Sequence, residues 1–161
     1  ALDKTPYNLT CYIDADTYIE HEDIQNIFEQ HDIKSDITIT KARRYAASIE
    51  SKFKGGQLID HCGLFIYNNE AQTLNFMKQW WLLYCKQDEG KWNWDTDLYP
   101  EYLRKWDMWT YWWLQNKTEH KIKRSYFPHP DARWNFVCVY DEKELDGQEA
   151  VIYHQPVPRK K

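Results

Sequence analysis

Glycine is scarce in this sequence, with five residues in 161, which argues against a barrel or sandwich built on many tight turns. Long hydrophobic runs are absent as well, because no stretch approaches the roughly 18 apolar residues of a membrane span. No leader peptide is visible either. We therefore expect a cytoplasmic protein without a membrane span.

Closely spaced cysteines and an excess of positive charge are also missing. The four cysteines are scattered without a CxxC pair, which favours free, mostly buried thiols over a zinc ribbon or a disulfide scaffold. The net charge of −4 and the pI near 5.9 give no reason to expect nucleic acid as a partner. The basic tail Arg159-Lys160-Lys161 is the exception and suits a local phosphate contact.

Aromatic residues, by contrast, are abundant, at 17% of the chain with nine Trp and twelve Tyr. Apolar residues make up 42% and charged residues 29%, which is a globular composition. The length is that of one domain, so we expect residues 1–161 to form a single domain with a sizeable core.

Hydrophobic periodicity predicts alternating strands and helices. Strands are expected at 9–13, 36–40 and 63–67, and further extended segments at 121–127, 134–140 and 150–154. Helices are expected at 20–32, at 70–86 after a cap from Asn68 and Asn69, and at 97–116 with an interruption near Lys105. The apolar stripe expected along the second helix is Leu74, Met77, Trp81, Tyr84 and Cys85. This order predicts an α/β fold.

The motif with the clearest chemistry is Asp14-Ala15-Asp16, directly after the strand at 9–13. Ligands of open α/β sheets bind outside the carboxyl ends of strands, where these aspartates fall. Two carboxylates so close repel one another, and a divalent cation resolves the repulsion. Oxygen ligands suit Mg²⁺ or Mn²⁺, which commonly share their shell with substrate phosphates.

Other interpretations of this motif stay open. The tripeptide can be a polar turn that ends a strand. A haloacid-dehalogenase-type phosphatase also places two aspartates after a strand. That family has Thr or Val where this chain has Tyr18, and the later acidic pair of the family is missing from this sequence.

Five blocks of the sequence, in order, resemble GT-A-fold nucleotide-sugar glycosyltransferases that carry a DxD motif, including glycogenin-like retaining enzymes. "CYIDADTYI" resembles their strand and DxD exit. "IDHCGLFIYNNEAQTLNFMKQWWLLY" is similar to their donor-pocket strand and the helix that follows. The remaining blocks are "KWDMWTYWWL" for the DQ block, "FPHPDARWNF" for the Pro…Trp-Asn segment, and "AVIYHQPVPRK" for the closing His-x-x-Gly-x-x-Lys.

The resemblance implies a GT-A-like, Rossmann-like mixed sheet flanked by helices, and a role for matching residues. Asp14, Asp16 and His154 would hold Mn²⁺ or Mg²⁺. Asp14, Gly63 and Lys160, or Arg159 beside it, would bind the UDP- or GDP-sugar donor. Asp107 and, by a weaker match, Asp60 would serve as catalytic residues that contact the transferred sugar. The tryptophans would mostly form core, with some from Trp92 to Trp113 offering a platform for the glycan or other hydroxyl acceptor.

The chain departs from the family pattern in places. His61-Cys62, Met108 and Val157 stand where the family has Asn-Ser, Gln and Gly, which leaves the donor sugar open. The strand that leads to the DxD begins at residue 9, so we expect much of the usual N-terminal nucleotide-binding half to be missing or supplied from elsewhere. The expected function is a metal-dependent hexosyltransferase-like enzyme, either retaining or inverting. A non-catalytic carbohydrate-binding or interaction module is the alternative from another class.

Overall fold

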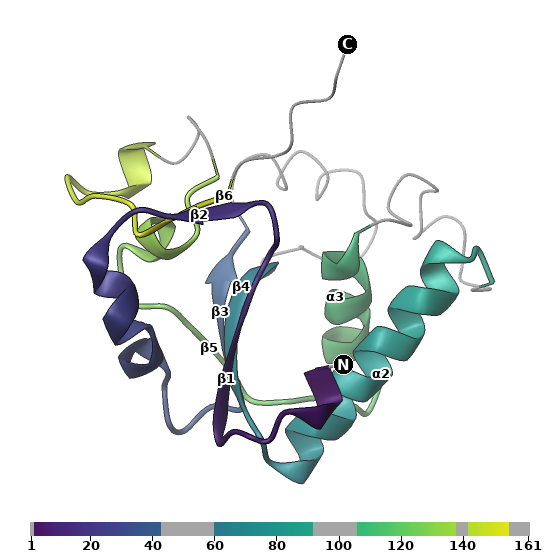
Figure 1. Ribbon diagram of the computed structural model, residues 1–161. Helices are drawn as coiled ribbons and strands as arrows, with labels where there is room; N and C mark the ends of the chain where they lie inside the picture. Colours follow the sequence, from purple (N-terminus) through teal and green to yellow (C-terminus); the bar gives the residue numbers. More distant parts are fainter. Residues whose placement is uncertain (1, 43–59, 92–105, 138–141, 155–161) are drawn as a thin grey trace.

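The structure is a computed structural model that describes residues 2–42, 60–91, 106–137 and 142–154. Its centre is a four-stranded sheet in the order β1-β4-β3-β5 (Figure 1). The strands are β1 (Leu9–Ile13), β3 (Ile37–Lys41), β4 (Asp60–Asn68) and β5 (Arg124–Tyr126). β4 pairs antiparallel with β1 and β3, whereas β3 and β5 run parallel, so the sheet is mixed.

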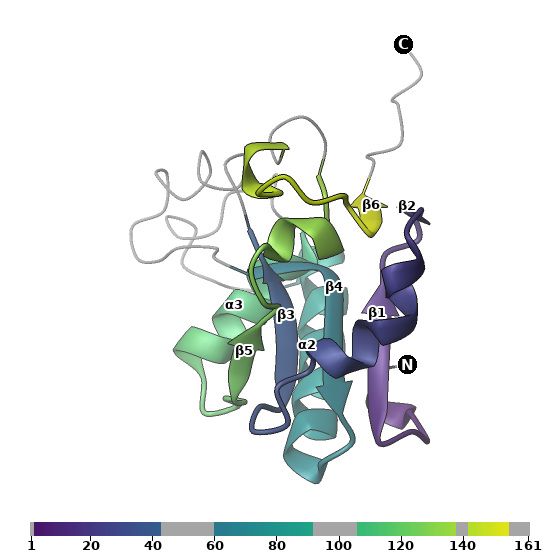
Figure 2. The same ribbon diagram turned by 90° about the vertical axis from the view of Figure 1, so that its left-hand side faces the viewer.

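Helices cover both faces of this sheet (Figures 1 and 2). The α-helices α2 (Ala71–Asp88) and α3 (Asp107–Lys117) lie on one face. The 3₁₀ helices η2 (Glu22–Gln30) and η4 (Asp131–Trp134) lie on the other. Two further 3₁₀ turns are η1 (Leu2–Lys4) and η6 (Glu142–Glu144). The predicted α/β class is confirmed.

Alternation along β4 builds a separate core on each face, as a strand with period two requires. Phe65 and Tyr67 pack with α2 and α3 in one hydrophobic cluster. Leu64 and Ile66 pack in the other, together with residues of η2, η4 and the last strand. All four side chains are at most 1% exposed, so the sheet is the shared wall of both cores.

A second, two-stranded sheet lies beyond the end of β1 (Figure 1). It pairs β2 (Thr17–Ile19) antiparallel with β6 (Ile152–His154), with Thr17 opposite His154. Because only Asp14, Ala15 and Asp16 separate β1 from β2, the DxD motif is the connection between the two sheets.

Three sequence predictions need correction. The segment 20–32 forms a 3₁₀ helix at Glu22–Gln30. The residue that caps α2 is Glu70, without a side-chain cap bond; Asn68 instead accepts hydrogen bonds from the Glu70 N–H and the Thr73 hydroxyl. The expected strand 134–140 is not formed in its described part: Trp134 ends η4, and Phe136 makes a single bridge to Tyr153.

The apolar stripe of α2 is also rotated by about one residue from the predicted one. Trp80 is 4% exposed, whereas Trp81 is 55% exposed. The other buried members are Thr73, Phe76, Met77 and Gln87. Most of the predicted third helix, 97–105, lies outside the described residues.

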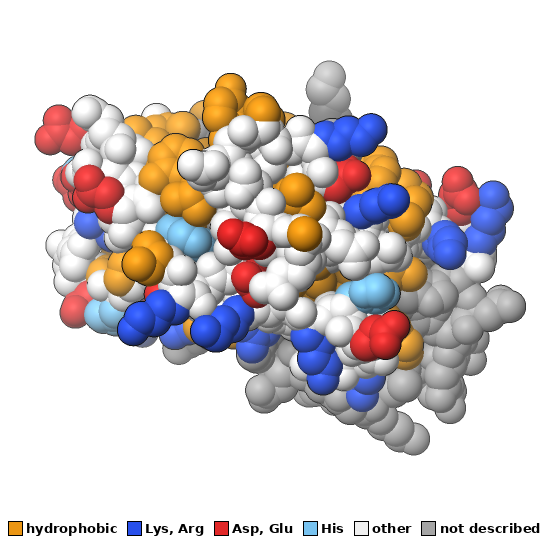
Figure 3. All heavy atoms as spheres, turned by 90° about the horizontal axis from the view of Figure 1, so that it is seen from below, with side chains coloured by type: hydrophobic (Ala, Val, Ile, Leu, Met, Phe, Trp, Pro, Cys, Tyr) orange, Lys and Arg blue, Asp and Glu red, His pale blue; other side chains and the backbone are white. Residues whose placement is uncertain are grey.

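The surface seen from below carries basic and acidic side chains interspersed with hydrophobic ones (Figure 3). Within the described residues, no helix combines the length and the apolar character that crossing a membrane requires.

Candidate metal centre and adjoining cavity

Asp14, Asp16 and His154 come together where the two sheets meet. One potential ligand atom from each lies within 4.8 Å of the others. The Nε2 atom of His154 is 3.2 Å from Asp16 Oδ1 and 3.7 Å from Asp14 Oδ2. The fold thus unites the three residues that the sequence analysis singled out as metal ligands.

Backbone pairing explains why these side chains converge. The Asp14 N–H donates to the Gly63 carbonyl at 3.0 Å, which extends the β1–β4 ladder by one residue. The Thr17 hydroxyl donates to the Asp14 carbonyl at 2.7 Å and closes the turn. Since Thr17 pairs with His154, the turn brings Asp16 next to the imidazole.

Gly63 is required by the same geometry. A Cβ atom at this position would lie 2.6 Å from both Cε1 and Nδ1 of His154, and 2.9 Å from Cε1 of His61. Such distances are far below van der Waals contact, so a larger residue would displace an imidazole ring. The family resemblance implied a glycine that lets the backbone approach a ligand; here the group that approaches it is His154.

A buried polar network lies behind His154, and the sequence analysis did not identify it. Nδ1 of His154 is 3.1 Å from Asn135 Oδ1. Nδ2 of Asn135 is 3.0 Å from Thr40 Oγ1 and 2.8 Å from His61 Nδ1. The His61 ring stands edge-on to that of His154, with ring centroids 5.2 Å apart. Asn135 was part of the quoted "FPHPDARWNF" block, but no local pattern in the sequence predicts its partners.

Burial dominates the electrostatics of Asp14. Loss of hydration raises the pKa of its carboxyl above the usual value, and the neighbouring Asp16 charge adds to this. The hydrogen bond from Tyr12 (2.8 Å to Oδ1) and the proximity of His154 act in the opposite direction. A cation between the carboxylates would offset both unfavourable contributions.

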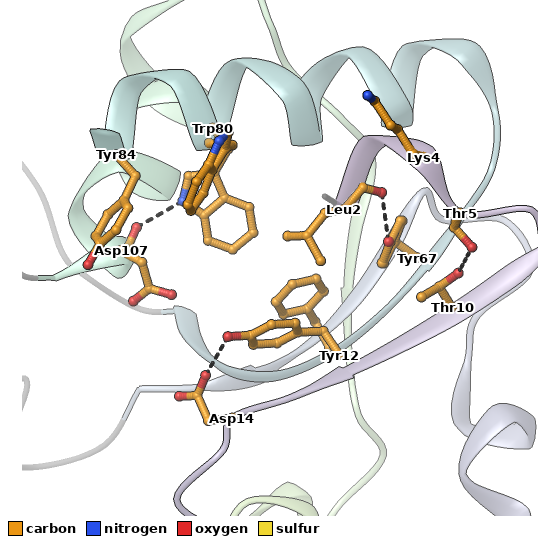
Figure 4. Close-up of a pocket in the computed structure, with 12 residues that line it drawn as sticks. Leu2, Lys4, Thr5, Thr10, Tyr12, Asp14, Tyr67, Trp80, Tyr84 and Asp107 are labelled. Atoms are coloured by element: carbon orange, nitrogen blue, oxygen red, sulfur yellow. Dashed lines mark hydrogen bonds between the residues drawn. The ribbon is translucent and has the colours of Figure 1, made fainter. Parts of the chain in front are cut away.

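An aromatic cavity of about 790 Å³ opens beside Asp14. It lies between β1, β4, α2 and η1, and the side chains of Asp14 and Asp107 both point into it (Figure 4). Its aromatic lining consists of Tyr12, Phe65, Tyr67, Trp80, Trp81 and Tyr84. An apolar cavity with a few carboxylates at one end is a common form of ligand site.

Asp107 begins α3 and is held there by its neighbours. Its Oδ1 accepts the Met108 N–H at 2.8 Å. The Trp80 indole donates to the Asp107 carbonyl at 3.1 Å and to the Thr110 hydroxyl at 3.0 Å, which ties α2 to the first turn of α3. Burial, reinforced by the Asp14 charge, raises the pKa of the Asp107 carboxyl to about 7. Such a carboxyl can donate or accept a proton near neutral pH.

The remaining predicted residues lie elsewhere. Asp60 is buried at the start of β4, where its carboxylate pairs with Arg124; burial raises its pKa while the guanidinium opposes the shift. It does not line the aromatic cavity. Lys160 and Arg159 fall outside the described residues, as do Trp92 and Trp94.

The buried tryptophans are structural. Trp80, Trp109 and Trp112 belong to the core between the sheet and the α-helices. Within the described residues, the aromatic side chains that line the cavity beside Asp14 come from β1, β4 and α2. Most of the predicted Trp92–Trp113 region lies outside the described residues.

Comparison with known proteins adds no assignment. No protein-family model matches the chain, and no curated protein matches it either.

Proposed function

We propose that this protein is a metal-dependent glycosyltransferase that transfers a sugar from a UDP- or GDP-sugar to an acceptor hydroxyl. The observation that carries the proposal is that His154, from near the other end of the chain, converges on Asp14 and Asp16 where the two sheets meet. The five sequence blocks that resemble DxD glycosyltransferases support the reaction type.

The donor set fits Mn²⁺ or Mg²⁺. Two carboxylates and one imidazole offer oxygen and nitrogen ligands, and three protein ligands leave positions for water or for substrate phosphates. When bound, the ion would supply Lewis-acid stabilisation to the departing nucleoside diphosphate. Asp16 and His154 would hold it, with Asp14 shared between the ion and the donor.

Among the described residues, Asp107 is placed to act on the sugars. Its carboxyl faces the same cavity as Asp14, and with a pKa of about 7 it can hydrogen-bond a sugar hydroxyl or take its proton. The aromatic walls suit the C–H faces of a sugar ring. Both a retaining and an inverting course are compatible with this arrangement.

The aromatic cavity also supports a second candidate, a non-catalytic carbohydrate-binding module. Such a module would bind saccharides in EDTA and would tolerate replacement of both Asp14 and Asp16. The glycosyltransferase, in contrast, requires the metal ligands for donor binding.

The test is isothermal titration of UDP and of GDP, with and without Mn²⁺, on the wild type, Asp16→Ala and Glu20→Ala. Glu20 is an exposed carboxylate on the same segment, so its replacement removes one charge without touching the cluster. We expect nucleotide binding that needs Mn²⁺, is lost in Asp16→Ala and is retained in Glu20→Ala. Nucleotide binding that is unchanged by EDTA or by Asp16→Ala would contradict the metal-dependent donor site.

A further inference from the structure

The protonation state of the His61 ring is fixed by the backbone. The N–H of Gly63 points at Nδ1 of His61, at a distance of 3.1 Å. A backbone amide can only donate, so Nδ1 must accept and carries no proton. The side chain of His61 is buried, at 6% exposure, and water does not compete freely for this contact.

The orientation of the Asn135 amide follows from two of its neighbours. The amide atom of Asn135 that is placed as Nδ2 lies 2.8 Å from Nδ1 of His61, which is an acceptor. The same atom is 3.0 Å from Thr40 Oγ1, whose single proton is directed at the His61 carbonyl at 3.2 Å. Both neighbours therefore need a donor, which is the NH₂ group. The reverse orientation would place a buried oxygen against two lone pairs.

The amide oxygen of Asn135 consequently faces Nδ1 of His154 at 3.1 Å, and this nitrogen must donate. The backbone holds the two residues in place: Phe136, next to Asn135, accepts the His154 N–H at 2.8 Å and donates to the Ile152 carbonyl at 2.9 Å. With its proton on Nδ1, His154 directs Nε2 at Asp14 and Asp16, where this nitrogen can bind a cation held by the carboxylates.

We infer that Asn135 is a positioning residue, which keeps a proton on Nδ1 of His154 and directs Nε2 at the two carboxylates. The proton on Nδ1 follows from the hydrogen bonds of the Asn135 amide. Its consequence for metal affinity rests on the metal site of the proposed function. Groups that orient a ligating imidazole through its other nitrogen typically change metal affinity by about 10–100-fold when they are removed.

The first measurement is long-range ¹H–¹⁵N NMR of the histidine rings in the full chain, without metal, at a mildly alkaline pH. We expect the wild-type His154 ring to carry a proton on Nδ1. A ring without a proton on Nδ1 would overturn the inference, and this result requires no variant and no metal.

The second measurement compares Asn135→Leu with Thr40→Val. Asn135→Leu removes the acceptor for His154; we expect a shift toward the Nε2–H tautomer and a loss of Mn²⁺ affinity of about 10–100-fold by titration calorimetry. Thr40→Val removes a contact on the opposite side of the same amide, so it should retain both properties. A folded Asn135→Leu variant with the wild-type tautomer would overturn the inference.

The two proposals fail in different ways. A wild type that binds no Mn²⁺ but shows the Nδ1–H tautomer would remove the metal from the proposed function and leave the role of Asn135 in orienting His154 intact. A wild type that binds Mn²⁺ through a ring protonated on Nδ1, with Asn135→Leu weakened, supports both.

Discussion

Asp107 is an acid whose protonated form the fold favours. Its pKa of about 7 lies above the ordinary value of 3.8 because the carboxyl is buried close to Asp14. The folded protein therefore binds this proton more tightly than the unfolded chain does. By linkage, the resulting stabilisation is complete below pH 3.8 and is lost as the pH rises through about 7.

We predict that Asp107→Asn becomes progressively more stable than the wild type as the pH rises through this range. Asparagine keeps an oxygen for the Met108 N–H but cannot ionise. The difference in unfolding free energy should grow to at most about 4 kcal/mol above neutral pH, since each pKa unit corresponds to about 1.4 kcal/mol. Urea denaturation at a series of pH values measures it.

Glu20→Gln serves as the control for this experiment, because it removes one exposed carboxylate from the same protein. A difference between Asp107→Asn and the wild type that stays constant across the pH range would show that Asp107 titrates as an ordinary carboxyl.

At the scale of elements, the indole of Trp80 is one of the contacts that join α2 to α3. The Trp80 Nε1–H is shared between the Asp107 carbonyl and the Thr110 hydroxyl, and its ring packs 5.1 Å from that of Tyr111. Trp81, one residue on, is 55% exposed. Trp80 and Trp81 therefore form a matched pair for testing which face of α2 packs against the core.

We predict that Trp80→Phe lowers the unfolding free energy by about 1–3 kcal/mol, because it removes a buried donor and part of a packed ring. Trp81→Phe should change it by less than about 0.5 kcal/mol. Chemical denaturation of both variants, with their midpoints compared, tests this. Equal losses would mean that α2 is rotated from the position described.

The difference between these two tryptophans also shows where sequence reasoning reached its limit. The strand at β4 was predictable because "GLFIY" is a short apolar run. On α2, however, large apolar side chains occur on several faces, so helical spacing alone could not select Trp80 over Trp81. The 3₁₀ form of η2 was missed for a related reason, since i, i+3 spacing suits both kinds of helix.

The candidate site, too, was predictable from the sequence only in part. Asp14 and Asp16 could be predicted as metal ligands from their position after a strand, and His154 from the resemblance to the glycosyltransferase family. Asn135 and His61 could not be found this way, because their roles depend on contacts between segments separated by 74 and 19 residues. A single asparagine has no spacing pattern that reports on such partners.

At the scale of the whole molecule, the proposed ion would form an additional connection between the two sheets. Asp14 belongs to the end of the large sheet, and His154 belongs to the small one. Binding to the folded state alone stabilises it by mass action, by about 2.7 kcal/mol at a ligand concentration of 100 times the Kd. The effect is absent if the cluster is not a site.

We predict that Mn²⁺ raises the Tm of the wild type in a concentration-dependent way and leaves the Tm of Asp16→Ala unchanged. Differential scanning calorimetry, with EDTA added afterwards to reverse the shift, provides the measurement. An equal rise in Asp16→Ala would place the stabilising ion elsewhere on the protein.

The pairing of Thr17 with His154 has a further consequence. Each of the two strands in this ladder is only three residues long, and a displacement by one residue turns every side chain to the opposite face. His154 would then point away from the aspartates. The small sheet therefore sets the number of residues allowed between Asp16 and the ladder. We expect a single inserted residue there to remove the His154 imidazole from the cluster and to leave the large sheet intact.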